Sequence, residues 1–279
     1  MLRNTTDLHD YAIHATDGMV GSVKDFYFDD QAWVIRYLVV DTGDWLPGRK
    51  VLVSPMLFEV PAWTTRELAV TRTCEQIRNS PDIDTERPVS RQQEAAYLSY
   101  YNYPDYWGGT GLWGGEMYPE LLGPNRGGLQ SVPPGAAAGL AAIDRLVQDQ
   151  APQRDKEDPH LRSCLAVTGH HIHTIDGAIG HVSGFLIDDR TWAIRYLVVA
   201  TSNWWIGHQV LIAPLWIDAV DWSSRSVTVN LTRHAIQSAP PYDPALQPDR
   251  AQEMHLYQHY GQPDYWTTAA DRDRPSLRV

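Results

Sequence analysis

The chain repeats itself, and this repeat limits what it can fold into more than any other feature. Shifted by 159 residues, the stretch Leu2–Trp107 aligns without a gap with Leu161–Trp266, and 39 of the 106 aligned positions are identical. The closest match joins WVIRYLVV at Trp33–Val40 to WAIRYLVV at Trp192–Val199. A repeat of this length is too long for one solenoid turn and is typical of a domain with its own core. The chain therefore contains two similar domains.

The repeat also sets the expected domain boundaries. The segment between the two copies is rich in glycine and proline, which is typical of a linker, and it contains apolar residues at helical spacing. The residues of this expected short helix are Leu140, Ile143, Leu146 and Val147. The expected divisions are a first repeat at 1–107, a linker at 108–160, a second repeat at 161–266 and a tail at 267–279.

Within each repeat, short β-prone runs alternate with turn residues. Asp17-Gly18 between apolar runs predicts a hairpin, since glycine tolerates a positive φ. The run Trp33–Val40 is apolar on both faces except at Arg36, which is typical of a central buried strand. Six short strands favour a small closed barrel, which leaves no exposed sheet edge. In the first copy the predicted strands are Tyr11–Ala15, Met19–Phe28, Trp33–Val40, Lys50–Ser54, Met56–Val60 and Glu67–Thr71.

A helix is expected after the strands of each copy. Ser90-Arg-Gln-Gln93 and Asp249-Arg-Ala-Gln252 both have the form of a capping box, in which the first side chain accepts from the N3 amide and glutamine reaches back. Apolar residues then follow at i and i+4, as on a helix face that packs on a sheet. These pairs are Tyr97 with Tyr101 and Leu256 with Tyr260. The fold predicted is mainly β, two barrels each followed by short helices.

Both repeats resemble the PRC-barrel family. The resemblance rests on Asp17-Gly18 followed by Gly21, on Val23–Asp30, on Trp33–Val40 and on Pro47–Pro55, and it is tightest over residues 11–72 and 170–231. That family includes the cytoplasmic domain of the photosynthetic reaction centre H subunit and the C-terminal domain of a ribosome maturation factor. The second copy departs from the pattern, with Ala200 for Asp41, Ile206 for Pro47, and His208-Gln209 for Arg49-Lys50.

Composition excludes several classes of function. The chain carries 23 Lys and Arg against 34 Asp and Glu, a net charge of −11, and neither half is basic. Nucleic-acid binding depends on neutralising phosphates, so DNA or RNA as a main partner is disfavoured. No apolar stretch approaches the ~20 residues that span a bilayer, and the N-terminus has no secretory signal. A cytoplasmic location is expected.

No catalytic motif or cofactor fingerprint is present, so a non-enzymatic protein–protein interaction module is expected, without a cofactor. Loops displaying exposed aromatic residues are frequent binding surfaces. The expected partner-binding residues lie in the loop before the fourth predicted strand of each copy and at the start of that strand: Trp45, Leu46, Arg49, Lys50, Trp204, Trp205 and His208. The identity of the partner is not encoded in these residues, and self-association of the chain is left open.

The second copy holds 8 of the 11 histidines, which keeps two alternatives open. His171 and His173 share one face of a strand, so with His181 they form a candidate metal site in a metal- or small-ligand-binding sensor. The other alternative is a soluble relative of the reaction centre H subunit with an accessory role in the light reaction, which the resemblance implies. Asp29-Asp30 and Asp188-Asp189 are expected to stabilise hairpin turns. Arg36 and Arg195 are expected to pair with a nearby carboxylate or carbonyl.

Overall fold

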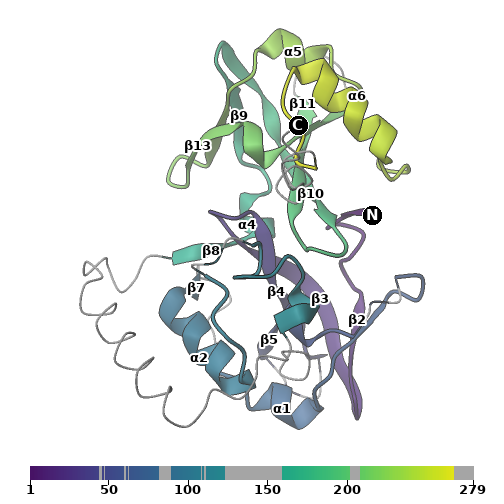
Figure 1. Cartoon of the computed structure of the whole chain (residues 1–279), viewed down its shortest axis with the longest axis vertical. Coiled ribbons are helices and arrows are strands. Elements are labelled where there is room, and N and C mark those ends of the chain that lie inside the picture. Colours follow the sequence, from purple (N-terminus) through teal and green to yellow (C-terminus); the bar gives the residue numbers. More distant parts are fainter. Residues whose placement is uncertain are drawn as a thin grey trace, which may run out of the picture. The chain divides into compact units, whose positions relative to one another are not determined.

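A computed structural model describes residues 1–43, 46, 48–59, 61, 63–81, 89–107, 109, 111–122, 159–201 and 208–266. This part of the chain consists of two mixed β-sheets with short helices, so the protein is mainly β as predicted (Figure 1). The strands are β1 (Leu2–Asn4), β2 (Ala12–Ala15), β3 (Gly18–Asp29), β4 (Val34–Asp41), β5 (Lys50–Val53), β6 (Glu67–Ala69), β7 (Val89–Ser90), β8 (Pro159–Ser163), β9 (His171–Thr174), β10 (Gly177–Asp188), β11 (Ile194–Thr201), β12 (Gln209–Ile212), β13 (Ile217–Asp221) and β14 (Ser226–Val229). The helices are α1 (Cys74–Arg78), α2 (Arg91–Tyr101), α4 (Cys164–Val167), α5 (Arg233–Gln237) and α6 (Arg250–Tyr260), with 3-10 turns at Pro55–Leu57, Pro119–Leu122 and Pro214–Trp216.

The chain divides into two compact units whose limits differ from the repeat boundaries. The repeat-1 unit holds Leu8–Ser163 together with Thr191–Ala193. The repeat-2 unit holds Met1–Asp7, Cys164–Arg190 and the chain from Ile194 onward. Each unit is therefore built mainly from one repeat and completed by a short piece of chain that the alignment assigns to the other.

The two sheets use the same pairings at equivalent positions. The repeat-1 sheet has the strand order β5-β4-β3-β2-β6, and the repeat-2 sheet has β12-β11-β10-β9-β14-β13. Val23 lies opposite Val40 in the first sheet, as Val182 lies opposite Val199 in the second. The parallel pairs β2–β6 and β9–β14 also correspond. The side chains of the central strands are almost fully buried, as the two-sided apolar pattern predicts.

The strand pairing shows a sheet in each copy but does not show the closed barrel that the sequence predicts. In the described residues, hydrogen-bonded strands form a path from β5 to β6 and from β12 to β13, and the ends of each path do not pair with one another. Each unit therefore contains a mixed sheet, in which the described strand pairs are antiparallel except for the parallel pairs β2–β6 and β9–β14.

One predicted strand is wrong at its start. Met56 lies in a 3-10 turn over Pro55–Leu57, and the chain becomes extended again at Phe58, which bridges Val70. Ser54 caps this turn through its hydroxyl, and Pro55 supplies the φ that begins it. The apolar run predicted a strand because it is buried, and the proline just before it is what bends the chain.

The units exchange their first strands. β1, at the start of the first repeat, pairs with β10 of the repeat-2 unit, with Leu2 opposite Asp188 and Asn4 opposite Leu186. β8, which runs into the start of the second repeat, pairs with β3 of the repeat-1 unit, and Leu161 lies opposite Asp29. The two registers are the same after the 159-residue shift. Each repeat thus contributes one strand to the sheet of the other repeat, and it receives the equivalent strand in return.

The length of β3 and β10 explains why each has room for such a strand. Both have 12 residues, whereas their neighbours β2 and β9 have four. β9 pairs with the stretch from Gly177 to His181 of β10, and β1 pairs with the following stretch from Leu186 to Asp188. The exchanged strand therefore satisfies backbone groups that would otherwise form an exposed edge.

The turn between β10 and β11 is the other piece that crosses a repeat boundary. Trp192 belongs to the repeat-1 unit, where its ring lies 5.5 Å from that of Phe58 and 5.8 Å from that of Trp63. Its carbonyl accepts a hydrogen bond from the amide of Ile35. Trp192 is 2% exposed and is therefore a core residue, although the core that it fills belongs to the other repeat.

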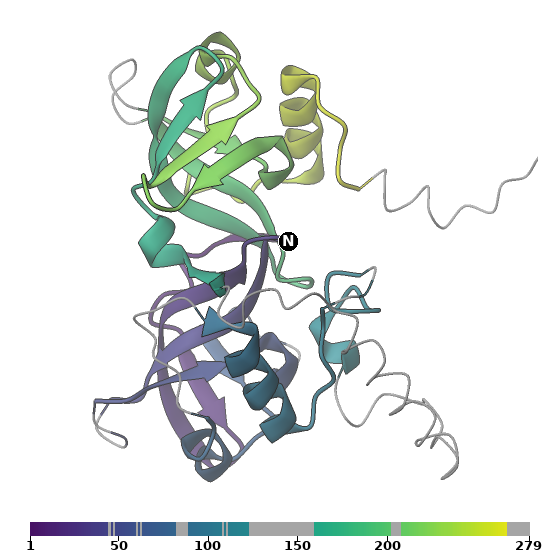
Figure 2. The same cartoon turned by 90° about the vertical axis from the view of Figure 1, so that its left-hand side faces the viewer.

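The predicted helices are confirmed together with their caps. Ser90 and Asp249 accept from the N3 amides of Gln93 and Gln252, and both glutamines reach back. The helices end at residues in the left-handed region, Asn102 and Gly261. The predicted apolar faces are buried, with exposed fractions of 1% to 8% at Tyr97, Tyr101, Leu256 and Tyr260. Figure 2 shows α6 alongside the strands of its unit.

Part of the expected linker is packed in the repeat-1 unit. Trp113 is completely buried, and its indole N–H donates to the carbonyl of Thr191 over 2.9 Å. Gly111 and Gly114, on either side of it, bridge each other, and a Cβ at Gly111 would lie 2.3 Å from the carbonyl oxygen of Glu116, so the backbone approaches too closely there for a side chain. The predicted helix around Leu140 lies outside the described residues. Among the described helices, none is long and apolar enough to cross a membrane.

Candidate functional site

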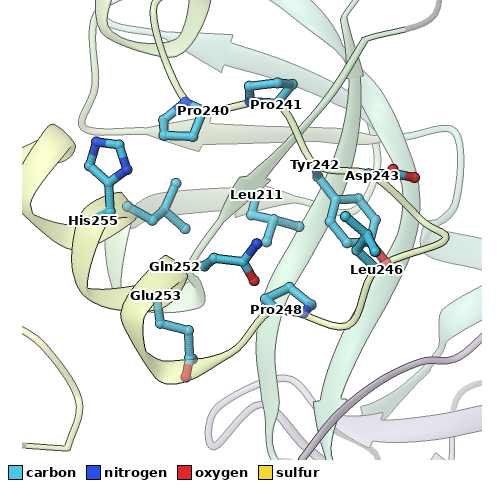
Figure 3. A pocket seen from close by; sticks show the side chains of 11 residues that line it. Leu211, Pro240, Pro241, Tyr242, Asp243, Leu246, Pro248, Gln252, Glu253 and His255 are labelled. Atoms are coloured by element: carbon cyan, nitrogen blue, oxygen red, sulfur yellow. The ribbon is translucent and has the colours of Figure 1, made fainter.

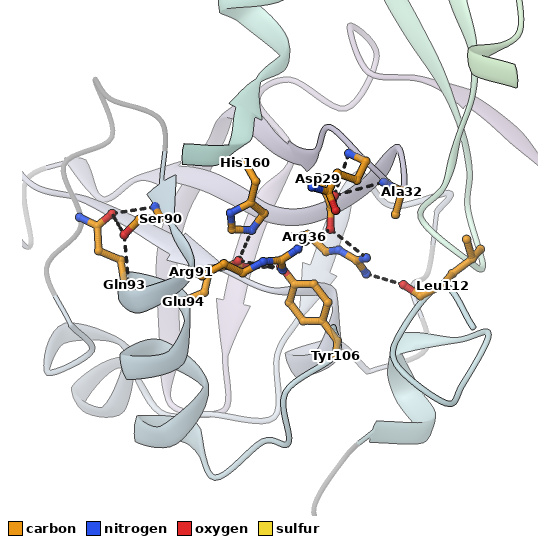
Figure 4. A network of polar contacts seen from close by, with 11 residues as sticks. Asp29, Ala32, Arg36, Ser90, Arg91, Gln93, Glu94, Tyr106, Leu112 and His160 are labelled. Atoms are coloured by element: carbon orange, nitrogen blue, oxygen red, sulfur yellow. Dashed lines mark hydrogen bonds and ion pairs between the residues drawn. The ribbon is translucent and has the colours of Figure 1, made fainter. Parts of the chain in front are cut away.

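A cluster of charged side chains lies buried in the repeat-1 unit (Figure 4). Asp29, Arg36, Glu94 and His160 are all 4% exposed or less. They come from the end of β3, from β4, from the first turn of α2 and from the exchanged strand β8. Burying so many charges is costly unless they satisfy one another, so their contacts determine what the cluster can do. With Arg91 and Tyr106 these residues form the repeat-1 network.

Asp29 stabilises both a turn and an arginine. Its carboxylate accepts from the amides of Gln31 at 2.9 Å and Ala32 at 3.1 Å, which confirms the predicted turn role. The same carboxylate lies 3.4 Å from the guanidinium of Arg36. Burial alone would raise the pKa of Asp29, but the charge of Arg36 and the two amides together hold that pKa below its ordinary value. Asp29 is therefore ionised and fixed in place.

Arg36 is enclosed on several sides. One guanidinium nitrogen donates to the carbonyl of Leu112 over 2.6 Å, so the expectation that this arginine pairs with a carboxylate or carbonyl is confirmed on both counts. The guanidinium also lies over the rings of Tyr106, at 4.0 Å, and Trp113, at 4.6 Å. Through Arg36, β4 is tied to the packed part of the linker.

Glu94 forms the second centre of the network. The capping box of α2 places it in the first helical turn, where it is completely buried. One carboxylate oxygen accepts from the hydroxyl of Tyr106, and the other lies 2.5 Å from Nε2 of His160 and 3.5 Å from Arg91. Burial, and after it the negative charge of Glu94, raise the pKa of Tyr106 well above its ordinary value. Tyr106 therefore acts as a hydrogen-bond donor to this carboxylate.

The repeat-2 unit builds the same network with one substitution. Glu253 is 4% exposed and accepts from the hydroxyls of Tyr196 at 2.9 Å and Tyr265 at 2.8 Å. Arg250 lies 3.0 Å from the other oxygen of Glu253. The position equivalent to His160 is Met1, which has no imidazole to offer. The repeat-2 network consists of Asp188, Arg195, Arg250, Glu253 and Tyr265.

Arg195 completes the parallel between the two networks. It lies 3.8 Å from Asp188 and 4.2 Å from the ring centre of Tyr265, as Arg36 lies against Asp29 and Tyr106. Arg195 is thus confirmed as pairing with a carboxylate. In both units the network joins the β-hairpin, the first turn of the long helix and the aromatic residue that follows the helix. Its carboxylates accept hydrogen bonds from groups that hold them in place, which favours a structural role.

The repeat-2 unit also carries an apolar groove (Figure 3). It lies between α6 and the loop Ala239–Pro248 and encloses about 740 Å³, part of it open to solvent. Figure 3 shows proline rings and leucine side chains facing the space, with Gln252, Glu253 and His255 along the helix side. We call this the proline groove, and its lining is Leu211, Pro240, Pro241, Tyr242, Asp243, Leu246, Pro248, Gln252, Glu253, His255 and Leu256.

The predicted partner-binding loop is only partly described. Trp45, Trp204 and Trp205 lie outside the described residues. Arg49 donates to the carbonyls of Arg78 at 2.7 Å and Ser80 at 2.8 Å, so it closes the C-terminal end of α1. Leu46 accepts from the hydroxyl of Thr42 through its carbonyl, and Lys50 is exposed at the start of β5. His208 is half-buried and accepts from Thr201 through its carbonyl.

The three histidines predicted as metal ligands are exposed on the repeat-2 sheet. His171 lies directly opposite His181 on neighbouring strands, whereas His173 lies opposite Ala178. The structure therefore brings two of the three together. Within the described part of the chain, no group of three or more His, Cys, Asp or Glu side chains is arranged to hold a metal ion.

Sequence reasoning missed the central residues of both networks. The sequence predicts a linker at 108–160 that includes His160, and it does not single out Glu94 or Tyr106 as functional residues. A signal was present, because Glu94 and Glu253, Tyr106 and Tyr265, and Arg91 and Arg250 are identical between the repeats. Charged residues kept at equivalent positions in two diverged copies, beside an arginine in an apolar strand, indicate a buried network.

No protein-family model matches the chain, and no curated protein matches it.

Proposed function

We propose that the chain is a non-enzymatic tandem PRC-barrel protein that binds a protein partner through the proline groove of its repeat-2 unit. The family part of the proposal is supported by the residues of the hairpins and central strands. It is also supported by the shared strand order of the two sheets and by the parallel pairing of first and last strands in each repeat. Closure of each sheet into a barrel belongs to this proposal.

The proposed binding of a protein partner rests on the proline groove. Ligand sites in proteins are concave and mostly apolar, with a few polar groups that fix orientation. Three prolines and three leucines form the apolar part of the groove, and five polar or charged side chains complete its lining. Leu246 is 56% exposed at its rim, which is a large apolar surface to leave against water.

The charges around the groove indicate the chemistry of the partner. Asp243 is exposed within the lining, and the chain as a whole carries a charge of −11. A partner segment with an apolar anchor flanked by lysine or arginine would bury its apolar side chain against Leu246 and place its positive charge near Asp243. Complementary charge of this kind speeds association more than it adds affinity.

The test compares capture of partners by three proteins under identical conditions. Leu246→Lys changes the groove, and Leu215→Lys changes an equally exposed leucine of the same unit outside it, since Leu215 is 70% exposed. We expect a protein captured by the wild type and by Leu215→Lys to be lost with Leu246→Lys, and its bound segment to be basic and apolar. Equal capture by the three proteins would place the binding surface elsewhere. Replacing Trp45, Trp204 and Trp205 by serine then tests the predicted loop in the same way.

A further inference from the structure

A second hollow lies beside the first turn of α6, on the side of the exchanged strand β1. It encloses about 760 Å³, part of it open to solvent. It borders the proline groove, with which it shares Pro248 and Glu253. We call it the α6 hollow, and its lining is Met1, Leu2, Asp188, Gln247, Pro248, Asp249, Arg250, Glu253 and Tyr265.

The lining of the α6 hollow corresponds to the repeat-1 network. Shifted by 159 residues, Asp188, Arg250, Glu253 and Tyr265 become Asp29, Arg91, Glu94 and Tyr106. Met1 and Leu2 become His160 and Leu161, and the strand pairings around these residues are the same. The amide of Asp189 donates to the carbonyl of Met1, as the amide of Asp30 donates to the carbonyl of His160. The α6 hollow is thus the counterpart of the space that surrounds His160.

In the repeat-1 unit an imidazole fills that space. His160 is 4% exposed, and its Nε2 lies 2.5 Å from the Glu94 carboxylate. In the repeat-2 unit the side chain at this position is that of Met1, which is 73% exposed and so does not occupy the hollow as His160 does. The same framework therefore surrounds an imidazole in one unit and a hollow that is partly open to solvent in the other.

Glu253 has the capacity to accept what Glu94 accepts. In the repeat-1 unit one oxygen of Glu94 contacts both Arg91 and His160, whereas the corresponding oxygen of Glu253 contacts Arg250. A carboxylate oxygen has two lone pairs, so a second donor can be added without displacing Arg250. Three acidic side chains, Asp188, Asp249 and Glu253, line the hollow together with Arg250 and with Met1, whose ammonium group pairs with Asp189 over 2.6 Å. Three negative charges in the lining therefore stand against two positive ones. This excess of negative charge favours a donor that can carry a positive charge.

From this correspondence we propose that the α6 hollow binds an imidazole group, whose N–H donates to the Glu253 carboxylate as His160 does to Glu94. The group is a histidine side chain of a partner or a small imidazole compound. The α6 hollow shares Pro248 and Glu253 with the proline groove, but the correspondence with the His160 site that supports this proposal does not depend on the proposed partner binding in the groove.

Titration with imidazole, followed by NMR of the backbone amides of the full chain, tests the proposal. We expect saturable shifts at Arg250–Glu253, next to the α6 hollow. Glycine in place of His160 creates the matching space in the repeat-1 unit, so this variant is expected to show a second set of shifts at Arg91–Glu94. If the His160→Gly protein does not fold, the wild-type titration decides by itself.

Two substitutions at the rim locate the site without touching the network. Gln247 is exposed, so lysine at this position places an ammonium group over the hollow, and alanine is its matched control. We expect Gln247→Lys to weaken imidazole binding at least tenfold and Gln247→Ala to leave it unchanged. Absence of saturable shifts in the wild type, or shifts that Gln247→Lys leaves unaltered, would overturn the proposal.

A second probe separates the two sources of the group. N-acetylhistidine methylamide carries the same ring on a peptide-like backbone. Tighter binding of this compound than of imidazole indicates a histidine of a protein partner, and weaker binding indicates a small molecule. Leu246→Lys, which tests the proline groove, should leave both titrations unchanged.

Discussion

Replacing the leucine of one exchanged strand should destabilise the repeat to which that leucine does not belong. Leu2 is 5% exposed and Leu161 is completely buried, each in the sheet of the other repeat. Leu2→Ala should therefore loosen the end of β10, more than 180 residues away along the chain, and leave β3 unchanged. Leu161→Ala should loosen the end of β3, although Leu161 begins the second repeat.

The size of the effect follows from the burial of the two side chains. Leucine-to-alanine changes in packed cores cost about 2–5 kcal/mol, because apolar contacts are lost and a cavity remains. The exchanged strand β1 has three residues, so few backbone hydrogen bonds oppose its release. With a factor of ten for every ~1.4 kcal/mol, amides that exchange through its opening should exchange roughly 30-fold to several-thousand-fold faster.

Hydrogen exchange measured by mass spectrometry checks this on peptides that cover Leu186–Asp188 and Tyr27–Asp29. The matched control is Leu165→Ala, a leucine that is 62% exposed close to β8, which should change neither peptide. Faster exchange at Tyr27–Asp29 in Leu2→Ala, with Leu186–Asp188 unaltered, would show that each repeat keeps its own first strand. That result would refute the exchange.

Three further predictions concern the networks and the sheets. Arg36→Met removes the nearer of the two guanidinium groups beside the buried Asp29, since Arg91 lies 3.6 Å away, and should cost about 3–5 kcal/mol in urea unfolding, whereas Arg195→Met, at a side chain that is 16% exposed, should cost less; equal losses would contradict the role of burial. The pKa of Asp29 is lowered, so its contribution to stability is complete above its unfolded value near 3.8 and is lost as the pH falls through the lower folded value. Asp29→Asn should therefore have a flatter stability curve than the wild type below about pH 4, and parallel curves would argue against an ionised Asp29. A Cβ at Gly21 would lie 1.9 Å from the carbonyl oxygen of Asp41, and one at Gly180 would lie 2.0 Å from that of Ala200. Gly21→Ala and Gly180→Ala should each lower the melting temperature, with exchange rising in the sheet that carries the change, while Gly115→Ala, which meets nothing within 4 Å, should be neutral.

The sequence by itself determined the local structure of both repeats. The capping boxes begin helices where they are predicted to, because the cap is a contact between residues three apart. The apolar runs become the central strands, and the apolar helix faces are buried, because these patterns follow from the periods of strand and helix. Asp29 stabilises its turn through its nearest neighbours.

Other features depended on contacts between distant residues. The strand predicted from Met56 begins as a 3-10 turn, and the glycine-rich segment assigned to a linker buries Trp113 beside Arg36. The network around Glu94 needs residues from β3, β4, α2 and β8 at one point in space. No local sequence pattern predicts that residues from these four elements come into contact.

The exchange of first strands was decided by the tertiary structure alone. Leu2-Arg3 and Leu161-Arg162 are the same two residues, and both arginines reach an aspartate of the sheet that they join, Asp189 at 3.1 Å and Asp30 at 2.8 Å. A repeat paired with its own strand would form equivalent contacts, so the local pairing energy does not distinguish the two arrangements. The assembled sheets alone show which strand each repeat receives, and this pairing places His160 in one network and Met1 beside the other.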